Sequence, residues 1–198
     1  CGGLGLALRE RFGIKDYTGI EINAHSVETA RRMNPAGRFL NEDVLAVSAA
    51  ALPETTYDLV VSLSCIDWNV EFDRMLVKAW GFVKNGGQFL SSFRITNGIS
   101  ISDISRSYQY INFAGKHEGE TAPYVVLNFN DLLTRLKALR PALISGYGYW
   151  GAPSPSAVTV YEQICFTVLA VEKAMRPVVV DARLDLKLPE EIPQILQN

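Results

Sequence analysis

The sequence has little that would mark a metal-binding, membrane or nucleic-acid-binding protein. Its three cysteines, at positions 1, 65 and 165, show no CxxC or Cys/His spacing, so neither a disulfide framework nor a zinc site is indicated. Nineteen Lys and Arg against 21 Asp and Glu give a net charge of -2, which provides no positive field for nucleic acid or an anionic membrane. No run of about 18 apolar residues occurs. We therefore expect a soluble, cytoplasmic protein of unknown oligomeric state, with no metal and with neither nucleic acid nor membrane as partner.

What the sequence does contain is an alternation of strand and helix patterns. Leu4, Leu8 and Phe12 stand at steps of four, which predicts a short helix that ends at Gly13. Further runs predict strands at 17–22, 38–40, 57–63 and 88–92, and helices at 26–33 and 71–83. Strands alternating with helices favour an α/β doubly wound fold, with a mostly parallel sheet covered by helices in a three-layer arrangement.

The second half of the chain predicts a different arrangement. Residues 95–128 lack clean periodicity and predict an irregular insertion, with one short helix near 102–110. A helix at 130–139 follows, and runs at 143–150 and 158–171 predict a closing antiparallel hairpin. We expect one domain over 1–173 and an extended tail over 174–198, where three prolines alternate with charges.

A glycine-rich turn opens the chain. Cys1-Gly2-Gly3-Leu4-Gly5 leads directly into the first helix, where glycines let a ligand approach the backbone and a helix start offers free N–H groups. A tight packing loop would look the same. Glu21 supports the functional interpretation, because it lies at the end of the predicted strand 17–22. Nucleotide-binding α/β units place an acidic residue there, which accepts hydrogen bonds from ribose hydroxyls.

These motifs, in this order, resemble those of the class I S-adenosylmethionine-dependent methyltransferases. That family's first motif typically ends in Gly-Cys-Gly-x-Gly, and Asn41-Glu42-Asp43-Val44 is similar to its adenine-binding motif. The run 57–64 resembles the family's fourth strand, and Val83-Lys84-Asn85-Gly86-Gly87 resembles its Leu-Lys-Pro-Gly-Gly turn, with Asn85 in place of proline. The resemblance implies a Rossmann-like fold and S-adenosyl-L-methionine as cofactor.

The resemblance also assigns cofactor-binding roles by position. Glu21 would hold the ribose, Asp43 the adenine amino group, and Val44 would line the adenine pocket. The full set that it implies is Cys1, Gly2, Gly3, Gly5, Glu21, Ile22, Asp43, Val44, Ser62, Leu63 and Ser64.

The sequence departs from the family pattern in two places. The family's first strand would lie before Cys1, so we expect an N-terminally truncated chain in which two strands lack their shared neighbour. No Asn-Pro-Pro-Tyr-like segment follows the fourth strand, where Ser64-Cys65-Ile66-Asp67-Trp68-Asn69 stands instead. Methylation of an amino group on a nucleic-acid base is therefore disfavoured.

Methyl transfer to a hydroxyl needs in-line alignment and removal of one proton. Candidates for the proton acceptor are Asp67, just after the fourth strand, and His117 in the insertion. For the substrate they are Trp68, Arg94 and Tyr108, within a wider aromatic set that adds Tyr110, Tyr147, Tyr149 and Trp150. Each has a plain structural alternative: Asp67 could cap a helix, His117 could be a solvated loop residue, and the aromatic residues could pack in the core. We interpret Cys65 as a buried structural residue.

Three functions compete at this level. The first is a methyltransferase acting on a small-molecule or glycan-precursor acceptor, at oxygen. The second is a nicotinamide-dependent oxidoreductase, because a glycine-rich turn and a ribose acid serve that cofactor too. The third is a non-catalytic methyltransferase-like domain that binds a partner.

Overall fold

The computed structural model describes residues 2–112, 114–176 and 181–192. The chain divides into two compact units, Cys1–Thr55 and Thr56–Asn198. Cys1, which the sequence assigns to the cofactor site, lies outside the described residues.

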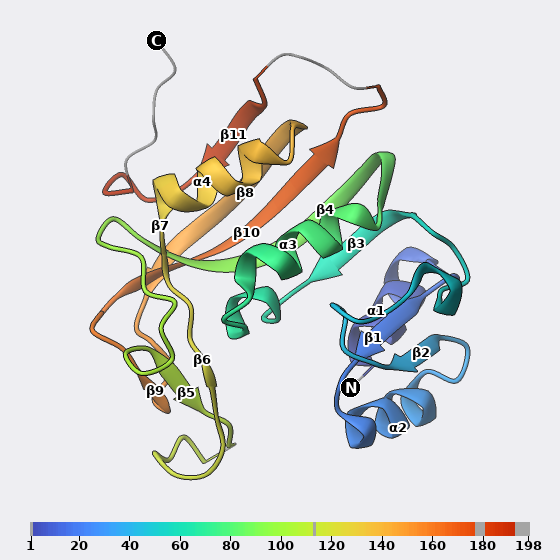
Figure 1. The fold of residues 1–198 in the computed structure, drawn as a ribbon, viewed down its shortest axis with the longest axis horizontal. Coiled ribbons are helices and arrows are strands. Elements are labelled where there is room, and N and C mark those ends of the chain that lie inside the picture. Colours follow the sequence, from blue (N-terminus) through green and yellow to red (C-terminus); the bar gives the residue numbers. More distant parts are fainter. Residues whose placement is uncertain (1, 113, 177–180, 193–198) are drawn as a thin grey trace. The chain divides into compact units, whose positions relative to one another are not determined.

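The first unit is a small α/β layer built on two parallel strands (Figure 1). Its elements are α1 (Gly3–Phe12), β1 (Thr18–Glu21), α2 (Ala24–Met33), β2 (Arg38–Asn41) and the 3₁₀ turn η1 (Ala49–Ala51). Val27 and Ala30 of α2 are buried against Phe39 of β2, and Tyr17 packs on this cluster. The predicted helices and strands of this segment are confirmed to within two residues at each end.

Local signals in the sequence set the ends of both helices. Gly13 adopts a left-handed conformation (φ 67°) and its N–H donates to Arg9, which ends α1 where the sequence predicts. Asn23 caps α2, because its side chain accepts a hydrogen bond from the backbone N–H of Ser26.

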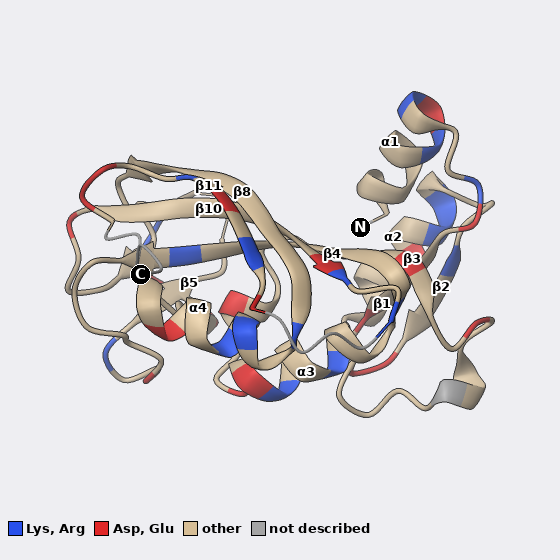
Figure 2. Cartoon of the chain, turned by 90° about the horizontal axis from the view of Figure 1, so that it is seen from above, with Lys and Arg blue, Asp and Glu red and all other residues tan. Residues whose placement is uncertain are grey.

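The second unit is a mixed sheet with two helices on one face (Figures 1 and 2). The strand order is β11-β8-β10-β4-β3, and the short β7 pairs with the end of β4. The elements are β3 (Tyr57–Ser62), α3 (Phe72–Gly81), β4 (Val83–Thr96), β7 (Leu127–Asn128), α4 (Phe129–Ala138), β8 (Pro141–Gly151), β10 (Ile164–Lys173) and β11 (Arg183–Lys187). β3, β4 and β7 run parallel, and β10 is antiparallel to both β4 and β8. The predicted Rossmann-like class, mostly parallel with an antiparallel C-terminal hairpin, is confirmed.

The amphipathic pattern of α3 explains how it covers the sheet. Phe72, Met75, Leu76 and Ala79 are all buried, and the Phe72 ring lies 5.9 Å from that of Phe93 on β4. Figure 2 shows acidic and basic residues interspersed along the other sides of α3 and α4. The helices therefore bury one apolar stripe each and leave a mixed-charge surface.

β4 begins five residues earlier than predicted, because the glycine turn lies inside the strand. Val83 already pairs with Tyr57, and the register then shifts so that Leu59 faces Gln88. Gly86 has φ 78°, and a Cβ on Gly87 would lie 2.9 Å from the carbonyl oxygen of Asp58. The two glycines thus permit a bulge that a larger residue would obstruct.

The insertion contributes two strands to a separate three-stranded antiparallel sheet, in place of the predicted helix. β5 (Tyr108–Tyr110) lies between β6 (Thr121–Pro123) and β9 (Ala157–Val158). The predicted helix near 102–110 is wrong. The Asp103 carboxylate accepts from the backbone N–H of Ser105, which favours a turn, and Tyr108 then pairs with Pro123 and Val158, which are distant in sequence.

Part of the predicted tail adds an edge strand: β11 pairs parallel with β8, from Arg183 opposite Leu143 to Lys187 opposite Tyr147. The domain bounds 1–173 and 174–198 stay a prediction. Among the described residues β1 pairs with β2 alone and β3 with β4 alone, so each leaves one edge unpaired.

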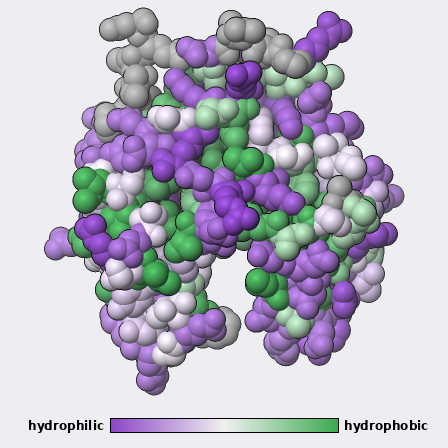
Figure 3. Space-filling view, viewed as in Figure 1, coloured by the Kyte–Doolittle hydropathy of each residue, from purple (hydrophilic) through white to green (hydrophobic). Residues whose placement is uncertain are grey.

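No helix in the part of the chain that the structure describes is long and apolar enough to cross a membrane. On the face seen in Figure 3, hydrophobic residues form small groups separated by hydrophilic ones.

Candidate functional site

The glycine turn of the first unit forms the start of α1. Gly2 is the N-cap, with φ 76° and no side-chain cap, and no acidic residue occupies the first turn. The N-terminal N–H groups of α1 therefore remain available to a ligand. A Cβ on Gly2 would lie 2.8 Å from Cα of Ala30, so this glycine permits close packing, whereas Gly3 faces open space. Gly5 is buried under the Tyr17 ring.

Glu21 stands at the end of β1, held by its neighbours. Its Oε1 accepts a hydrogen bond from the backbone N–H of Asn23 (2.9 Å), which leaves Oε2 as a further acceptor. The Asn41 amide donates to the carbonyl oxygens of Glu21 (3.1 Å) and Ile22 (2.8 Å), which ties the ends of the two parallel strands together. The side chain of Ile22 is 70% exposed. This end of β1 thus presents a fixed carboxylate and an exposed apolar side chain.

Asp43 and Val44 follow β2 at the same end of the two-stranded sheet. Asp43 is exposed, and its Oδ1 accepts from the backbone N–H of Leu45 (2.9 Å), while Val44 is half-buried. The first unit therefore brings to one sheet edge the acid that the sequence assigns to the ribose and the acid assigned to the adenine.

The end of β3 in the second unit carries the other residues assigned to the cofactor. Ser62 Oγ is buried without a hydrogen-bond partner in the described structure, and Leu63 is 41% exposed. Ser64 has a left-handed backbone (φ 49°), and its N–H donates to Ser92 Oγ at 2.7 Å. A non-glycine residue in this region stores strain, and such residues cluster at functional sites.

A buried ion pair lies just beyond this strand. Asp67, in the 3₁₀ turn η2 (Ile66–Trp68), is 3% exposed, and Arg94 on β4 is 5% exposed. Nε of Arg94 lies 3.4 Å from Oδ2 of Asp67, and Nη1 donates to the Asp67 carbonyl oxygen at 2.9 Å. Arg94 thus bonds both the backbone and the side chain of one residue, which fixes η2 on the sheet.

Two aromatic rings enclose the guanidinium. Its carbon lies 3.7 Å from the ring centroid of Tyr124 and 5.2 Å from that of Trp68. Burial raises the pKa of the Asp67 carboxyl, and the positive charge of Arg94 opposes this shift. Burial also lowers the pKa of Arg94, and the negative charge of Asp67 opposes that shift. Burial thus disfavours the charged form of each residue, and the charge of its partner opposes that effect.

Two polar atoms of this cluster lack partners. Oδ1 of Asp67 and Nε1 of Trp68 are buried and make no hydrogen bond within the described structure. An unsatisfied buried acceptor or donor costs roughly 1–3 kcal/mol, which a bound polar group would relieve. The Asp67 carboxylate can therefore accept one more proton donor.

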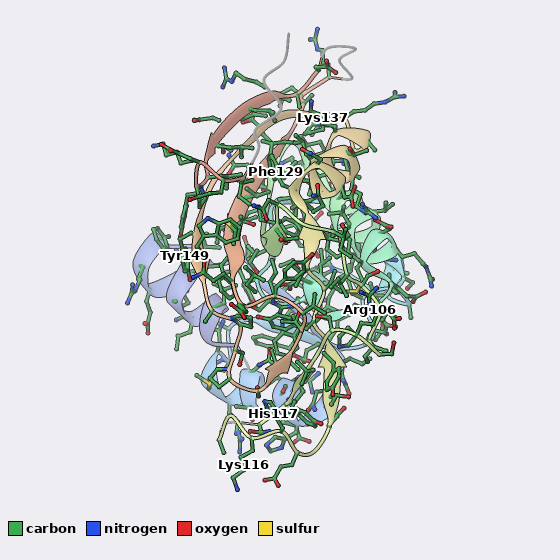
Figure 4. The ribbon with its side chains drawn as sticks, turned by 90° about the vertical axis from the view of Figure 1, so that its left-hand side faces the viewer. Arg106, Lys116, His117, Phe129, Lys137 and Tyr149 are labelled. Atoms are coloured by element: carbon green, nitrogen blue, oxygen red, sulfur yellow. The ribbon has the colours of Figure 1, made fainter. Side chains whose placement is uncertain are left out.

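The other proposed proton acceptor, His117, lies elsewhere in the second unit. Figure 4 shows His117 and Lys116 in the loop at the opposite end of this unit from Lys137. Nε2 of His117 contacts the Pro155 carbonyl oxygen at 2.8 Å, so Nε2 carries the proton and Nδ1 is the free acceptor. Its ring stacks on Tyr110 at 5.5 Å. His117 is exposed.

The predicted aromatic set does not form one cluster. Tyr108 contacts Tyr110 edge-on at 5.6 Å on the small sheet, whereas Tyr147 and Tyr149 are 56% and 59% exposed on β8, where Figure 4 labels Tyr149. Trp150 donates to the Glu191 carboxylate at 3.0 Å. Trp68 and Arg94 come together, and Tyr108 stands apart with Tyr110 and His117.

The cysteine interpretation needs one correction. Cys65 is exposed rather than buried, because it follows the strand end in a turn. Cys165 is buried on β10, and burial raises its pKa to about 11. No group of three or more His, Cys, Asp or Glu residues able to hold a metal ion occurs within residues 2–112, 114–176 and 181–192.

Sequence reasoning missed Tyr124, which gives Arg94 its nearest ring contact. Tyr124 begins the apolar run Tyr124-Val-Val-Leu127, and all four residues are buried. That run was the available signal that the insertion returns to the core before α4.

Comparisons with known proteins agree with this geometry. Residues 1–91 match the family model of the methyltransferase domain. An S-adenosylmethionine-dependent methyltransferase from Clostridium acetobutylicum is similar in structure, with 11% identity, a TM-score of 0.56 and coverage of 87% of this chain and 80% of that chain. A Burkholderia thailandensis 1,6-didemethyltoxoflavin-N1-methyltransferase, solved with S-adenosylhomocysteine, has 14% identity, a TM-score of 0.52 and coverage of 87% and 77%. The [4+2]-cyclase SpnF has 15% identity, a TM-score of 0.57 and coverage of 89% and 74%. No curated protein matches in sequence.

The match and the fold point to one class. Residues 1–91 of the 198 match the methyltransferase domain, and the fold of the chain is shared with S-adenosylmethionine-dependent methyltransferases. The cyclase shows that this fold also hosts other chemistry, so the acceptor has to be argued from the site.

Proposed function

We propose that the protein transfers a methyl group from S-adenosylmethionine to a hydroxyl oxygen of a small-molecule or glycan-precursor acceptor. The observation that carries this proposal is Oδ1 of Asp67, a buried carboxylate oxygen that lacks a hydrogen-bond partner in the described structure. A hydroxyl acceptor must lose a proton as the new bond forms, and a carboxylate within hydrogen-bond reach can take it.

The environment of Asp67 suits this role. Burial raises the pKa of its carboxyl and the charge of Arg94 opposes that shift, while Arg94 fixes the orientation of the carboxyl through Oδ2 and the backbone. Oδ1 is then left for the acceptor. Arg94, enclosed by two rings, serves in this proposal as a positioning residue, and Trp68 supplies an indole N–H as a second polar contact.

The residues assigned to the cofactor fit its chemistry. The carboxylate of Glu21 keeps one oxygen free for a ribose hydroxyl, Asp43 offers a carboxylate oxygen for an amino group, and Gly3 leaves open space beside the backbone. Ile22 and Val44 add apolar side chains, and Gly2, Gly5 and the segment 62–64 complete the proposed set. S-adenosylmethionine supplies a methyl group that its sulfonium already activates.

His117 is the second candidate for the proton acceptor, through Nδ1. Its Nε2–H bond to Pro155 fixes the tautomer that leaves Nδ1 unprotonated. The stacked Tyr110 and the neighbouring Tyr108 would then contact the acceptor.

The test uses the intact protein, radiolabelled S-adenosylmethionine and a panel of phenols, sugars, carboxylates and amines. We expect labelling of a hydroxyl acceptor, and loss of about 10²–10⁴-fold in rate for Asp67→Asn with unchanged cofactor affinity. His117→Gln is the matched variant, and its rate should stay near wild type if Asp67 is the proton acceptor. Labelling of amines alone would contradict the oxygen proposal, and a full rate in Asp67→Asn would remove Asp67 from it.

Two further elements of the proposal concern setting and partners. The three cysteines show no CxxC or Cys/His spacing, which supports a reducing, cytoplasmic location. The net charge of -2 supports a small molecule rather than a nucleic acid as partner.

A further inference from the structure

A second candidate site lies in the second unit, where three neighbouring strands of the sheet meet. Cys165 of β10 pairs with Ile95 of β4 on one side and with Trp150 of β8 on the other. A cavity of about 300 Å³ opens beside these three paired residues. It is lined by Thr96, Asn97, Trp150, Tyr161, Gln163 and Glu191.

The lining is held in place by its own hydrogen bonds. The Trp150 indole donates to Oε2 of Glu191 at 3.0 Å, and the Tyr161 hydroxyl donates to the Ile99 carbonyl oxygen at 2.5 Å. Thr96 Oγ1 accepts from the backbone N–H of Gly98 at 3.0 Å. The Trp150 ring and the Glu191 carboxylate are therefore held together, and the Tyr161 ring is held to the loop that carries Ile99.

The charge of the lining excludes one class of ligand. Glu191 is the sole charged residue among the six, and the indole N–H lowers its pKa, so the carboxylate is ionised near neutral pH. Among the described lining residues there is no Lys or Arg to neutralise a phosphate or a carboxylate. An anion would be repelled by Glu191 with no opposite charge to compensate it.

The same lining suits a cation. Oε1 of Glu191 remains an acceptor, and an indole and a phenol ring offer electron-rich faces of the kind that bind ammonium groups. A neutral hydroxylated ring could stack on Trp150, but it would gain nothing from the full charge of Glu191. We propose that this cavity binds an organic ammonium group, with Glu191 as counter-ion and Trp150 and Tyr161 as aromatic walls.

The test compares two probes that share one shape and differ in charge. Choline and its neutral isostere 3,3-dimethyl-1-butanol are titrated separately into the ¹⁵N-labelled intact protein, and the indole N–H signal of Trp150 is followed by NMR. Trp150→Phe assigns that signal. We expect choline to shift it and to bind about five-fold more tightly than the isostere, since both the charge and the rings contribute at an exposed site.

Glu191→Gln separates charge from shape, because its amide oxygen can still accept from the indole N–H. Choline should then bind no better than the isostere. Glu190→Gln, a change of the neighbouring exposed carboxylate that does not line the cavity, should leave choline affinity unchanged.

Methyl glucoside, a neutral hydroxylated ring, is titrated in the same way as a third probe. Four results would overturn the proposal: no shift of the Trp150 signal with choline, equal binding of choline and its isostere, unchanged choline binding by Glu191→Gln, or tighter binding of methyl glucoside than of choline. The last would assign the cavity to a hydroxylated ring. None of these measurements needs S-adenosylmethionine, so the outcome is independent of the proposed methyl transfer.

Discussion

Arg94 contacts Asp67 in two ways: Nη1 donates a hydrogen bond to its backbone carbonyl oxygen at 2.9 Å, and Nε forms an ion pair with its carboxylate at 3.4 Å. Both residues are buried, so each charge depends on the other. Arg94→Met should therefore lower the free energy of unfolding by about 3–5 kcal/mol, because it leaves an uncompensated buried carboxylate. Chemical denaturation measures this.

The matched control is the ion pair of Arg135 with Asp73, at 2.7 Å but on the surface. Arg135→Met should cost at most about 1 kcal/mol, since water screens that pair. Equal losses of unfolding free energy from the two substitutions would show that burial does not increase the cost of removing Arg94.

The raised pKa of Asp67 predicts a specific pH dependence of stability. Burial is the larger cause of the shift and Arg94 opposes it, so the folded protein binds this proton more tightly than the unfolded chain, whose reference pKa is 3.8. The contribution of Asp67 to stability is thus greatest below pH 3.8 and falls as the pH rises through the folded pKa. The free energy of unfolding is measured for Asp67→Asn and for wild type between pH 3.5 and about 6. The value for the variant should increase relative to that of wild type as the pH rises. A difference that is flat with pH would mean that the carboxyl has an ordinary pKa.

Glu21→Gln should weaken binding of S-adenosylhomocysteine by about 1–3 kcal/mol, because the ribose hydroxyls lose their charged acceptor. Isothermal titration checks the affinity. Glu28→Gln, which changes an exposed carboxylate on α2, should bind as wild type does. Wild-type affinity in Glu21→Gln would mean that the ribose lies elsewhere.

Two glycines of α1 should respond oppositely to a methyl group. A Cβ on Gly5 would lie 2.7 Å from the Tyr17 ring and 2.9 Å from Nδ2 of Asn34, so Gly5→Ala should destabilise the chain by about 1–3 kcal/mol. A Cβ on Gly3 meets nothing within 4 Å, and Gly3→Ala should be neutral or slightly stabilising. Thermal unfolding measures both, and equal losses would contradict the packing of α1 described here.

The two internal cysteines should differ in reactivity. Cys65 is exposed, whereas Cys165 is buried with a pKa of about 11, so an alkylating reagent at pH 7.5 should modify Cys65 in the native protein and Cys165 only after unfolding. Peptide mass spectrometry distinguishes the sites. Native modification of Cys165 at a similar rate would show that β10 opens readily.

Local signals made the α/β elements predictable. Gly13, Asn128 and the apolar steps of α3 define helix ends and faces within a few residues. The motif order predicted a resemblance to methyltransferases, and residues 1–91 match the methyltransferase domain. The insertion was not predictable in this way, because β5 pairs with β6 and β9, segments separated from it by more than ten residues. Its sheet depends on long-range pairing that no local pattern encodes.

The candidate site was predictable only in part, for the same reason. The position of Asp67 after β3 could be read from the sequence, but its pairing with Arg94, 27 residues away, and with the ring of Tyr124 depends on the sheet. The burial of Arg94 changes its proposed role from a substrate contact to a residue that positions Asp67.

The most direct test is isothermal titration of S-adenosylhomocysteine into the intact protein, shown to be folded by circular dichroism. The methyltransferase-domain match and the proposed cofactor-binding residues predict saturable binding with one-to-one stoichiometry, weakened in Glu21→Gln. No heat of binding from a folded protein, together with no methyl transfer to any acceptor, would contradict the proposed methyl transfer.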